Sequence, residues 1–251
     1  MLNEKTSAVI ITGACGGIGR EMCKCFFESG YKVIAIDSRE AIPGLESDKF
    51  IRMDLTKILN DASAKQDLKN FIYEVIEGSM LKGLVNNAAI QIVRSFEDLT
   101  EDDWKLTLDT NLLVPFVLSQ LLLEPLAAGS GSILNVSSIH ANQTKRYFAA
   151  YATSKAALSS MTRLLAIELG NRIRVNAIEP GAIATEMLEE GFKNSPEKRT
   201  QLDAMQPMKR IGTPQEVAQL ARFLISEEAQ FINGATVQID GGIRSQLYDP
   251  N

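Results

Sequence analysis

Tyr151 and Lys155 stand four residues apart, a spacing at which an ammonium group can assist proton transfer by a phenol. Residues at this interval share one face of a helix, which brings the ammonium close to the phenol or to a sugar hydroxyl beside it. A nearby positive charge favours phenolate and lowers a tyrosine pKa from its usual value of roughly 10. The same spacing occurs on many solvated helix faces, so its meaning depends on the surrounding motifs. Ser138 lies thirteen residues upstream of Tyr151.

A glycine-rich turn near the start of the chain, Thr12 to Gly19, follows a short apolar run and leads into a helical pattern. Glycines in such a turn let the backbone approach a pyrophosphate closely, and the next helix offers unpaired N–H groups to the phosphates. Asp37 ends the second predicted strand 18 residues beyond Gly19. This is close to the interval of about 20 residues at which a carboxylate reaches the adenosine ribose. We therefore expect a dinucleotide site here.

Asp37 also favours NAD(H) over NADP(H), because a carboxylate at the ribose repels a 2′-phosphate. Arg39 is a basic residue that could pair with such a phosphate, but Asp37 holds the strand end, and the turn carries Cys15 instead of a cation. Asp54 ends the third predicted strand and has two possible roles. It either accepts a hydrogen bond from the adenine amino group or caps the helix that follows.

Strands alternate with helices along the whole chain. Strands are predicted at 8–12, 33–36, 50–53, 83–85, 132–136, 174–178 and 236–239, and helices at 17–29, 63–78, 101–125, 150–169 and 214–225. This order predicts an α/β class, a single-domain Rossmann fold with a doubly wound parallel sheet of about seven strands flanked by helices. The single domain spans 1–251, and the insertion at 186–212, which carries two prolines, is the candidate substrate lid.

Size, composition and charge limit the classes of partner. A chain of 251 residues with 45% hydrophobic content can bury one full core, and a net charge of -5 argues against a nucleic-acid partner. Apolar runs stay shorter than the roughly 18 residues of a membrane span, so we expect no membrane partner and a cytoplasmic location. Cys15, Cys23 and Cys25 have no histidine near them to complete a zinc site, so no metal is expected.

Together these motifs resemble the short-chain dehydrogenase/reductase family over essentially the whole chain. Residues 12–19 are similar to its Thr-Gly-x-x-x-Gly-x-Gly turn, and residues 86–89 to its Asn-Asn-Ala-Gly segment, with Ala89 in place of the glycine. Pro180-Gly181 followed by Thr185 resembles the segment that contacts the nicotinamide amide, and residues 239–242 resemble a C-terminal signature. Glu179 departs from the family pattern, in which a small or neutral residue is more common before the proline.

The resemblance implies a catalytic tetrad of Asn111, Ser138, Tyr151 and Lys155. In the family mechanism Tyr151 exchanges a proton with the substrate oxygen while hydride passes between substrate and nicotinamide. Lys155 holds the nicotinamide ribose, and Ser138, selected over Ser137 by its interval to Tyr151, donates to the substrate oxygen. Asn111 is implied to position a water that links Lys155 to solvent. The implied cofactor contacts are Gly13, Cys15, Gly16, Gly17, Ile18, Gly19, Asp37, Asp54, Leu55, Asn87, Ala88, Tyr151, Lys155, Pro180, Gly181, Ile183 and Thr185.

Three polar residues are candidate substrate contacts: Gln91, His140 and Glu179. If they face the pocket, its polarity favours a small sugar, polyol or other hydroxylated substrate, although a lone loop histidine is more often a hydrogen-bonded wall residue. Two alternatives stay open. One is a 3-oxoacyl thioester reductase, acting on acyl-carrier-protein substrates with NADPH, against which Asp37 and Cys15 count. The other is a non-catalytic NAD-binding protein. The family's usual assembly implies a homotetramer or a homodimer.

Overall fold

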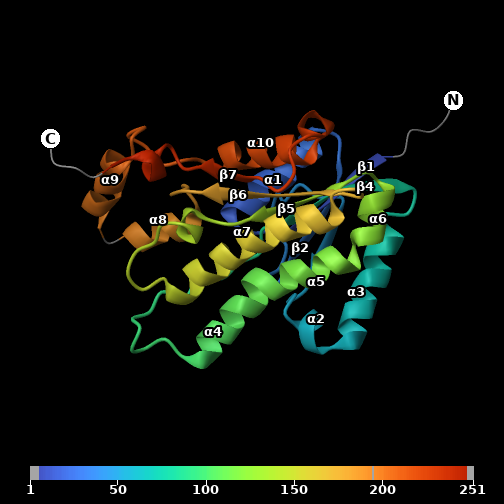
Figure 1. Cartoon of the computed structure of the whole chain (residues 1–251), viewed down its shortest axis with the longest axis horizontal. Helices are drawn as coiled ribbons and strands as arrows, with labels where there is room; N and C mark the ends of the chain where they lie inside the picture. The colour runs from blue at the N-terminus through green and yellow to red at the C-terminus, as the bar shows by residue number, and fades with distance from the viewer. Residues whose placement is uncertain (1–5, 194, 248–251) are drawn as a thin grey trace.

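The computed structural model describes residues 6–193 and 195–247, and a parallel seven-stranded sheet forms its centre (Figure 1). The strand order is β3-β2-β1-β4-β5-β6-β7, which confirms the predicted doubly wound fold. The order reverses between β1 and β4, and ligands of such sheets bind at the carboxyl ends of the strands beside this point. The strands are β1 (Thr6–Thr12), β2 (Lys32–Asp37), β3 (Lys49–Arg52), β4 (Ser79–Asn86), β5 (Ser132–Val136), β6 (Arg174–Pro180) and β7 (Thr236–Ile239).

Helices cover both faces of this sheet. One layer contains α1 (Gly17–Glu28) and α10 (Pro214–Ile225), which pack against each other (Figure 1). The opposite layer contains α2 (Lys57–Asn60), α3 (Ala62–Val75), α4 (Glu101–Leu108), α5 (Val114–Leu121), α6 (Leu123–Ala128) and α7 (Ala149–Leu169). The chain also forms the short helical turns η2 (Ile139–Ala141), η3 (Glu227–Ala229) and η4 (Ile243–Ser245).

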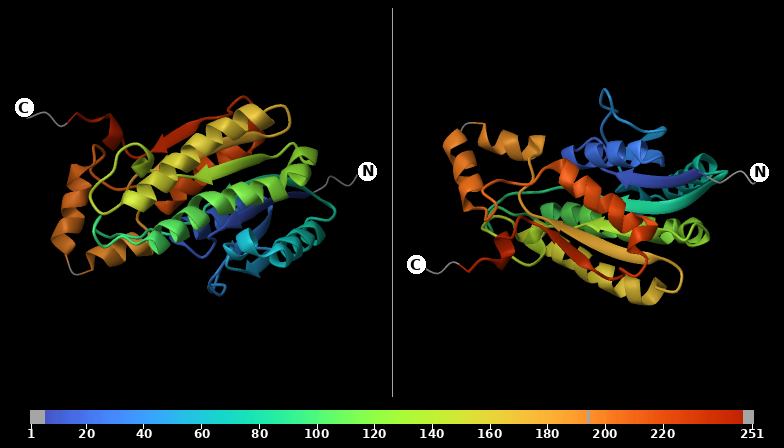
Figure 2. Two further views of the ribbon diagram at one scale, coloured as in Figure 1. Left: turned by 60° about the horizontal axis from the view of Figure 1, so that its bottom comes forward. Right: turned by 90° about the horizontal axis from the view of Figure 1, so that it is seen from above.

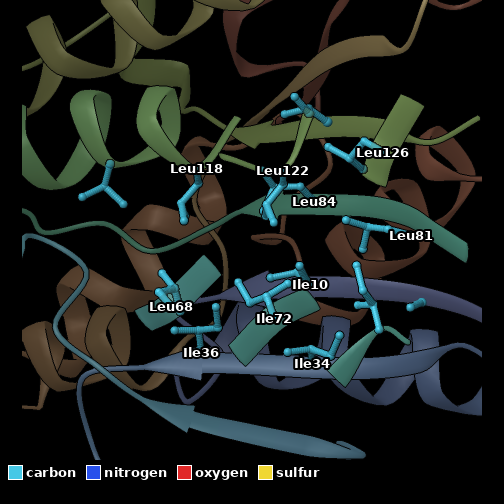
Figure 3. Close-up of a cluster of buried hydrophobic side chains, with 14 of the residues drawn as sticks. Ile10, Ile34, Ile36, Leu68, Ile72, Leu81, Leu84, Leu118, Leu122 and Leu126 are labelled. Atoms are coloured by element: carbon cyan, nitrogen blue, oxygen red, sulfur yellow. The ribbon is translucent and has the colours of Figure 1, made fainter. Parts of the chain in front are cut away.

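The two cores follow from the alternation of side chains along each strand. In β1, Ala8 and Ile10 join the cluster under α3 and α5, whereas Val9 and Ile11 join the cluster under α1 and α10. Figure 3 shows the first cluster, in which leucines of α3 and α5 meet isoleucines of β1 and β2. Full burial of each such side chain contributes about 1.5–3 kcal/mol, so both layers are anchored and the strand ends between them are held in place.

The stretch 101–125 is helical as predicted, but it is not one regular α-helix. The chain forms α4, then a π-helical turn η1 (Asp109–Leu113), then α5 and α6. Pro115 has no N–H to donate to the carbonyl of Asn111, and Pro125 likewise lacks the donor that would join α5 to α6. Single π-helical turns inside α-helices occur frequently at functional sites, and this one carries Asn111.

Two helices that the sequence patterns did not predict lie within the 186–212 segment. They are α8 (Glu186–Phe192) and α9 (Pro196–Met205), and Figure 2 shows them beyond one end of the sheet, outside both helix layers. Arg20 of α1 lies 3.6 Å from Glu186, and Arg199 bonds both Glu189 and Asp203. The first pair connects the segment to α1 and the Arg199–Glu189 pair connects α8 with α9, and each surface pair contributes little by itself.

Candidate active site

The glycine turn is built so tightly that two of its positions exclude any side chain. A Cβ at Gly19 would stand 2.1 Å from the carbonyl oxygen of Gly13, and Gly13 itself has φ +64 with a Cβ position 2.8 Å from Ala88. Gly16 precedes the first residue of α1, which has no acidic residue in its first turn. The unpaired N–H groups of α1 are therefore free to face an anionic group, as a pyrophosphate requires.

Hydrogen bonds between side chains and backbone groups join the ends of β1 and β4 at the point where the strand order reverses. The Asn87 amide nitrogen donates to the carbonyl oxygens of Thr12 at 2.9 Å and Gly13 at 3.1 Å. In return, the Thr12 hydroxyl accepts from the backbone N–H groups of Asn87 and Ala88, both at 3.0 Å. Asn87 thus fixes the glycine turn to the neighbouring strand, a role in addition to the cofactor contact expected of it.

Asp37 lies at the end of β2, and both oxygens of its carboxylate accept hydrogen bonds from the protein. Oδ2 accepts from the Cys15 N–H at 2.9 Å, and Oδ1 accepts from the Arg39 N–H at 2.9 Å. Burial alone raises the pKa of Asp37, but the hydrogen bonds from Arg39 and Cys15 outweigh it and hold this pKa below its usual value. The group is therefore an anion at neutral pH, as a ribose-binding carboxylate must be.

A cleft of ≈ 1360 Å³ runs from this turn across the carboxyl ends of the strands. All seventeen expected cofactor residues line it, together with Ser138, Gln91 and His140, whereas Asn111 and Glu179 do not. Asp54 lies on the cleft wall, and its Oδ1 accepts from the backbone N–H of Thr56 at 3.0 Å. Thr56, and not Asp54, holds the N-cap position of α2, so the alternative prediction that Asp54 caps the helix is wrong. The Ala182 to Thr185 segment is tied to Gly212 by backbone hydrogen bonds and reaches over the glycine turn, where Thr185 contacts Gly17.

Tyr151 and Lys155 belong to the first turns of α7 and line this cleft together with Ser138. The Lys155 ammonium lies 5.7 Å from the centre of the Tyr151 ring and donates to the carbonyl oxygen of Val136 at 2.8 Å. Burial lowers the pKa of Lys155 to about 7. Burial also raises the pKa of Tyr151, and a hydrogen bond with the Ser138 side chain opposes that increase. Desolvation, and not the lysine charge, thus dominates the titration of both groups in this structure.

The side chains of Ser137 and Ser138 have different partners, as expected from the alternation of side chains along a strand. The Ser137 hydroxyl donates to the Lys155 carbonyl at 3.0 Å and lies 2.7 Å from the Ser159 hydroxyl, inside the packing against α7. The Ser138 hydroxyl accepts from the His140 N–H at 3.2 Å, so its own proton can be donated toward Tyr151. The geometry therefore leaves Ser138 as the donor that can meet a substrate oxygen.

Asn111 is completely buried and braces two elements of the site. Its Oδ1 accepts from the Ile90 N–H at 2.9 Å, and its Nδ2 donates to the Ile90 carbonyl and the Ser154 hydroxyl, each at 3.0 Å. Ser154 directly precedes Lys155 in α7. Asn111 therefore holds the loop after β4 against the helix that carries Tyr151 and Lys155.

His140 is a neutral aromatic wall beside Tyr151. Its ring stacks on Phe148 at 4.5 Å between centroids and meets the Tyr151 ring edge-on at 5.8 Å, and its Nδ1 lies 2.9 Å from the Thr144 hydroxyl. Burial, with a smaller contribution from Lys145, lowers the pKa of His140 to about 4. The histidine is thus uncharged at neutral pH.

Glu179 lies behind the cleft wall and not on it. Its carboxylate accepts from Ser159, Asn142 and Arg244, and the residue is 1% exposed. The structure adds wall residues that the sequence patterns did not indicate, because they come from the 186–212 segment, the loop before α7 and the C-terminal turn: Lys145, Phe148, Leu188, Phe192, Met205, Gln206 and Ile243.

Two classes of feature are absent from residues 6–193 and 195–247. No three His, Cys, Asp or Glu side chains there are grouped to hold a metal ion. No helix in the same ranges has both the length and the apolar character needed to cross a membrane. Cys15, Cys23 and Cys25 are free thiols.

A family model described as enoyl-(acyl carrier protein) reductase matches residues 13–244. The chain belongs to the short-chain dehydrogenase/reductase family. This short-chain dehydrogenase/reductase is 37% identical to protein FixR of Bradyrhizobium diazoefficiens, over 93% of the chain and 85% of that relative. It is 32% identical to the L-xylulose reductase of Caenorhabditis elegans, over 93% of the chain and 94% of the relative. It is also 32% identical to an NAD-dependent glycerol dehydrogenase of Listeria innocua, over 96% and 94% respectively.

Solved structures of the same family share the fold. A ligand-free aldohexose dehydrogenase of Thermoplasma acidophilum has a TM-score of 0.90 at 29% identity, covering 98% of this chain and 97% of that one. A 4-hydroxyisoleucine dehydrogenase complexed with NADH has a TM-score of 0.84 at 30% identity, covering 96% and 100%. ElxO with NADP bound has a TM-score of 0.86 at 29% identity, covering 97% and 100%. The short-chain dehydrogenase/reductase described here is an oxidoreductase of alcohol and carbonyl groups that uses a nicotinamide cofactor.

Proposed function

We propose that the protein is an NAD(H)-dependent oxidoreductase that transfers a hydride between nicotinamide and an alcohol or carbonyl carbon of a small polar substrate. The observation that carries this proposal is the placement of Tyr151, Lys155 and Ser138 in the same cleft as the glycine turn and Asp37. A cofactor bound along the turn and a substrate beside Tyr151 would then share one continuous space. The bound nicotinamide supplies the hydride acceptor or donor.

Tyr151 is the general acid and base of this reaction. In the reducing direction its phenol gives a proton to the substrate oxygen, and in the oxidising direction its phenolate takes that proton back. Ser138 donates a hydrogen bond to the same oxygen and stabilises the charge that develops there. The Lys155 ammonium, in its protonated form, favours the phenolate and binds ribose hydroxyls. Asn111 positions Lys155 through Ser154 and, with an ordered water, provides a route for the proton to solvent.

The residues around the turn fit an adenine dinucleotide with an unphosphorylated ribose. Side chains at Gly13 or Gly19 would collide with the chain itself and open the tight turn on which a pyrophosphate would lie, and the Asp37 carboxylate is an acceptor for ribose hydroxyls. NAD(H) is therefore favoured over NADP(H). Arg39 is a nearby cation that supports the opposite choice, but it already pairs with Asp37.

The substrate is a sugar, polyol or similar hydroxylated compound. Gln91, Gln143 and Thr144 bring polar groups to the substrate half of the cleft, beside the apolar surfaces of Phe148 and Leu188. This mixture suits a ligand that has several hydroxyl groups and a short carbon chain. The names of related proteins, an L-xylulose reductase and a glycerol dehydrogenase, agree with that class.

The chain acts as one domain in which the 186–212 segment is the lid, and as a cytoplasmic homotetramer or homodimer. The lid assignment is supported by Leu188, Phe192 and Met205, which belong to α8 and α9 and line the cleft. Assembly is supported by large apolar side chains that remain exposed on α5, α7 and η1, namely Leu113, Phe116, Leu164 and Ile167. Light scattering of the purified protein tests the assembly.

Absorbance at the reduced-nicotinamide band tests the proposed reaction. Sugars, polyols, hydroxy acids, secondary alcohols and oxoacyl thioesters are screened with NAD(H) and NADP(H) in parallel. Turnover of a hydroxylated compound with NAD supports the proposal. Turnover confined to an oxoacyl thioester with NADPH would instead favour the thioester reductase, and binding of NAD without turnover of any compound would favour a non-catalytic protein.

A further inference from the structure

Three charged side chains form a buried cluster behind the substrate half of the cleft. Glu179 of β6, Arg244 of η4 and Asp240 between β7 and η4 have side chains that are 2%, 7% and 6% exposed. Arg244 Nη1 lies 2.7 Å from Glu179 Oε2, and Arg244 Nε lies 3.4 Å from Asp240 Oδ2. Removing charges from water is costly unless ion pairing and further hydrogen bonds compensate. A cluster of two carboxylates and one guanidinium therefore depends on its other partners.

Those partners belong to the elements that form the active site. Glu179 Oε1 accepts from the Ser159 hydroxyl at 2.8 Å, and Ser159 lies one turn beyond Lys155 in α7. Glu179 Oε2 also accepts from the Asn142 amide at 3.0 Å, in the loop that follows Ser138 and His140. One carboxylate thus connects α7, the loop after β5 and the C-terminal turn.

The C-terminal turn is part of the cleft wall although the charged cluster is not. Ile243, the neighbour of Arg244, lines the cleft, whereas Glu179, Asp240 and Arg244 do not. Asp240 Oδ1 accepts from the Gly242 N–H at 2.9 Å, which anchors the start of the same turn. Pro207 and Met208, at the end of the proposed lid, lie next to Gly242 and Gly241. Ile243 therefore lies between the cleft and a turn that is held both by its own hydrogen bonds and by the ion pair of Arg244.

We propose that the Glu179–Arg244 pair is a positioning device that holds Ile243 as a fixed wall of the substrate pocket and thereby sets the KM for substrate. The inference rests on the proposed dehydrogenase reaction and adds to it the residues that determine the pocket's shape. Glu179 and Arg244 touch neither substrate nor cofactor, so their effect is on substrate binding and not on proton or hydride transfer.

Steady-state kinetics of Glu179→Gln test this role. The amide keeps the shape of the side chain and can still accept from Ser159, but it removes the closer of the two carboxylates beside Arg244 and leaves Asp240 as its remaining carboxylate partner. We expect KM to rise about tenfold with kcat changed less than about threefold, the pattern of lost substrate binding. Ile243→Ala, which leaves all charges in place, should raise KM in the same way. Arg172→Gln is the control, because Arg172 forms an exposed pair with Glu124.

Hydrogen exchange of the Gly242, Ile243 and Ser245 amides provides a readout that does not require turnover. Each of these N–H groups is bonded within the turn. In Glu179→Gln they should exchange at least about tenfold faster than in the parent protein, while the amides of α10 keep their rates. If no compound is turned over, the proposed function fails, but this experiment still tests the anchoring of the turn.

Two results would overturn the inference. A lower melting temperature with unchanged KM and unchanged exchange would make the cluster a structural ion pair only. A loss of kcat at constant KM would show instead that Glu179 acts on Lys155 and Tyr151 through Ser159. Arg244→Gln should raise KM because it removes the cation. Arg244→Lys keeps a cation, so its KM should lie between those of the parent protein and Arg244→Gln if pairing is the cause.

Discussion

The Arg39 guanidinium lies side-on against the Asp37 carboxylate, with Nε 3.1 Å from Oδ1 and Nη2 3.3 Å from Oδ2. The two partners differ in environment, because the Asp37 side chain is 5% exposed and the Arg39 side chain 59%. The carboxylate that would bind a ribose therefore also holds a cation at the mouth of the adenosine site. Cofactor choice depends on which of the two groups faces the 2′ position.

Replacing Asp37 by alanine should release Arg39 and reverse the proposed preference for NAD(H) over NADP(H). Loss of the carboxylate removes an acceptor for ribose hydroxyls, and the freed guanidinium can pair with a 2′-phosphate. We expect the ratio of NADP to NAD affinity to increase by about 10- to 100-fold, the size of a hydrogen bond to a charged group. Calorimetric titration with both cofactors measures it. The double variant Asp37→Ala/Arg39→Ala should lose most of the gain, and an equal gain there would exclude Arg39 as the phosphate partner.

Tyr151→Phe should lower kcat by about 10²- to 10⁴-fold, because it removes the proton donor and acceptor and leaves the aromatic ring in place. Binding of NADH, followed by fluorescence titration, should change by less than about twofold. Tyr147→Phe is the matched control, since Tyr147 is 55% exposed in the loop before α7. Parent-like turnover of Tyr151→Phe would contradict the proposed mechanism.

Gly19→Ala should disrupt the cofactor turn and the fold around it. The added methyl group would stand 2.1 Å from the Gly13 carbonyl oxygen, so the backbone must move. We expect the free energy of unfolding to fall by more than about 4 kcal/mol, together with loss of NAD binding. Gly191→Ala is the stability control, because no heavy atom lies within 4 Å of its Cβ position and alanine favours helix. Melting curves that coincide for parent and Gly19→Ala would show that the turn is less tight than this packing requires.

His140 should titrate near pH 4, and as the single histidine of the chain it can be followed directly by NMR. Between pH 6.5 and 4 the unfolded chain binds a proton at this histidine and the folded chain does not. The protein therefore loses stability as pH falls through this window, and His140→Gln should reduce that loss. Lys145→Ala should raise the midpoint, since it removes one of the two causes of the shift. A midpoint close to 6.5 in the parent protein would mean that the His140 ring is solvated.

Much of the fold follows from local patterns in the sequence. Strands such as Ala8–Thr12 are recognisable because β-branched apolar runs end at turns, and alternation of strands with helices predicts a parallel sheet. The glycine turn and Asp37 are likewise visible because a tight turn and a strand-end carboxylate are local features. The π-helical turn at 109–113 also has a local cause, because Pro115 has no N–H to donate to the Asn111 carbonyl.

The sequence by itself determined which residue types occupy the strand ends and the first turns of α7, and so the reaction class. Only the tertiary structure decided how those groups behave. Burial, a property of the packed chain, lowers the pKa of Lys155 and leaves His140 neutral, and spacing along the chain carries no information about desolvation. Glu179 is the clearest case. Its neighbours in sequence predict a pocket residue, but contacts with Asn142, Ser159 and Arg244, distant along the chain, turn its carboxylate away from the cleft.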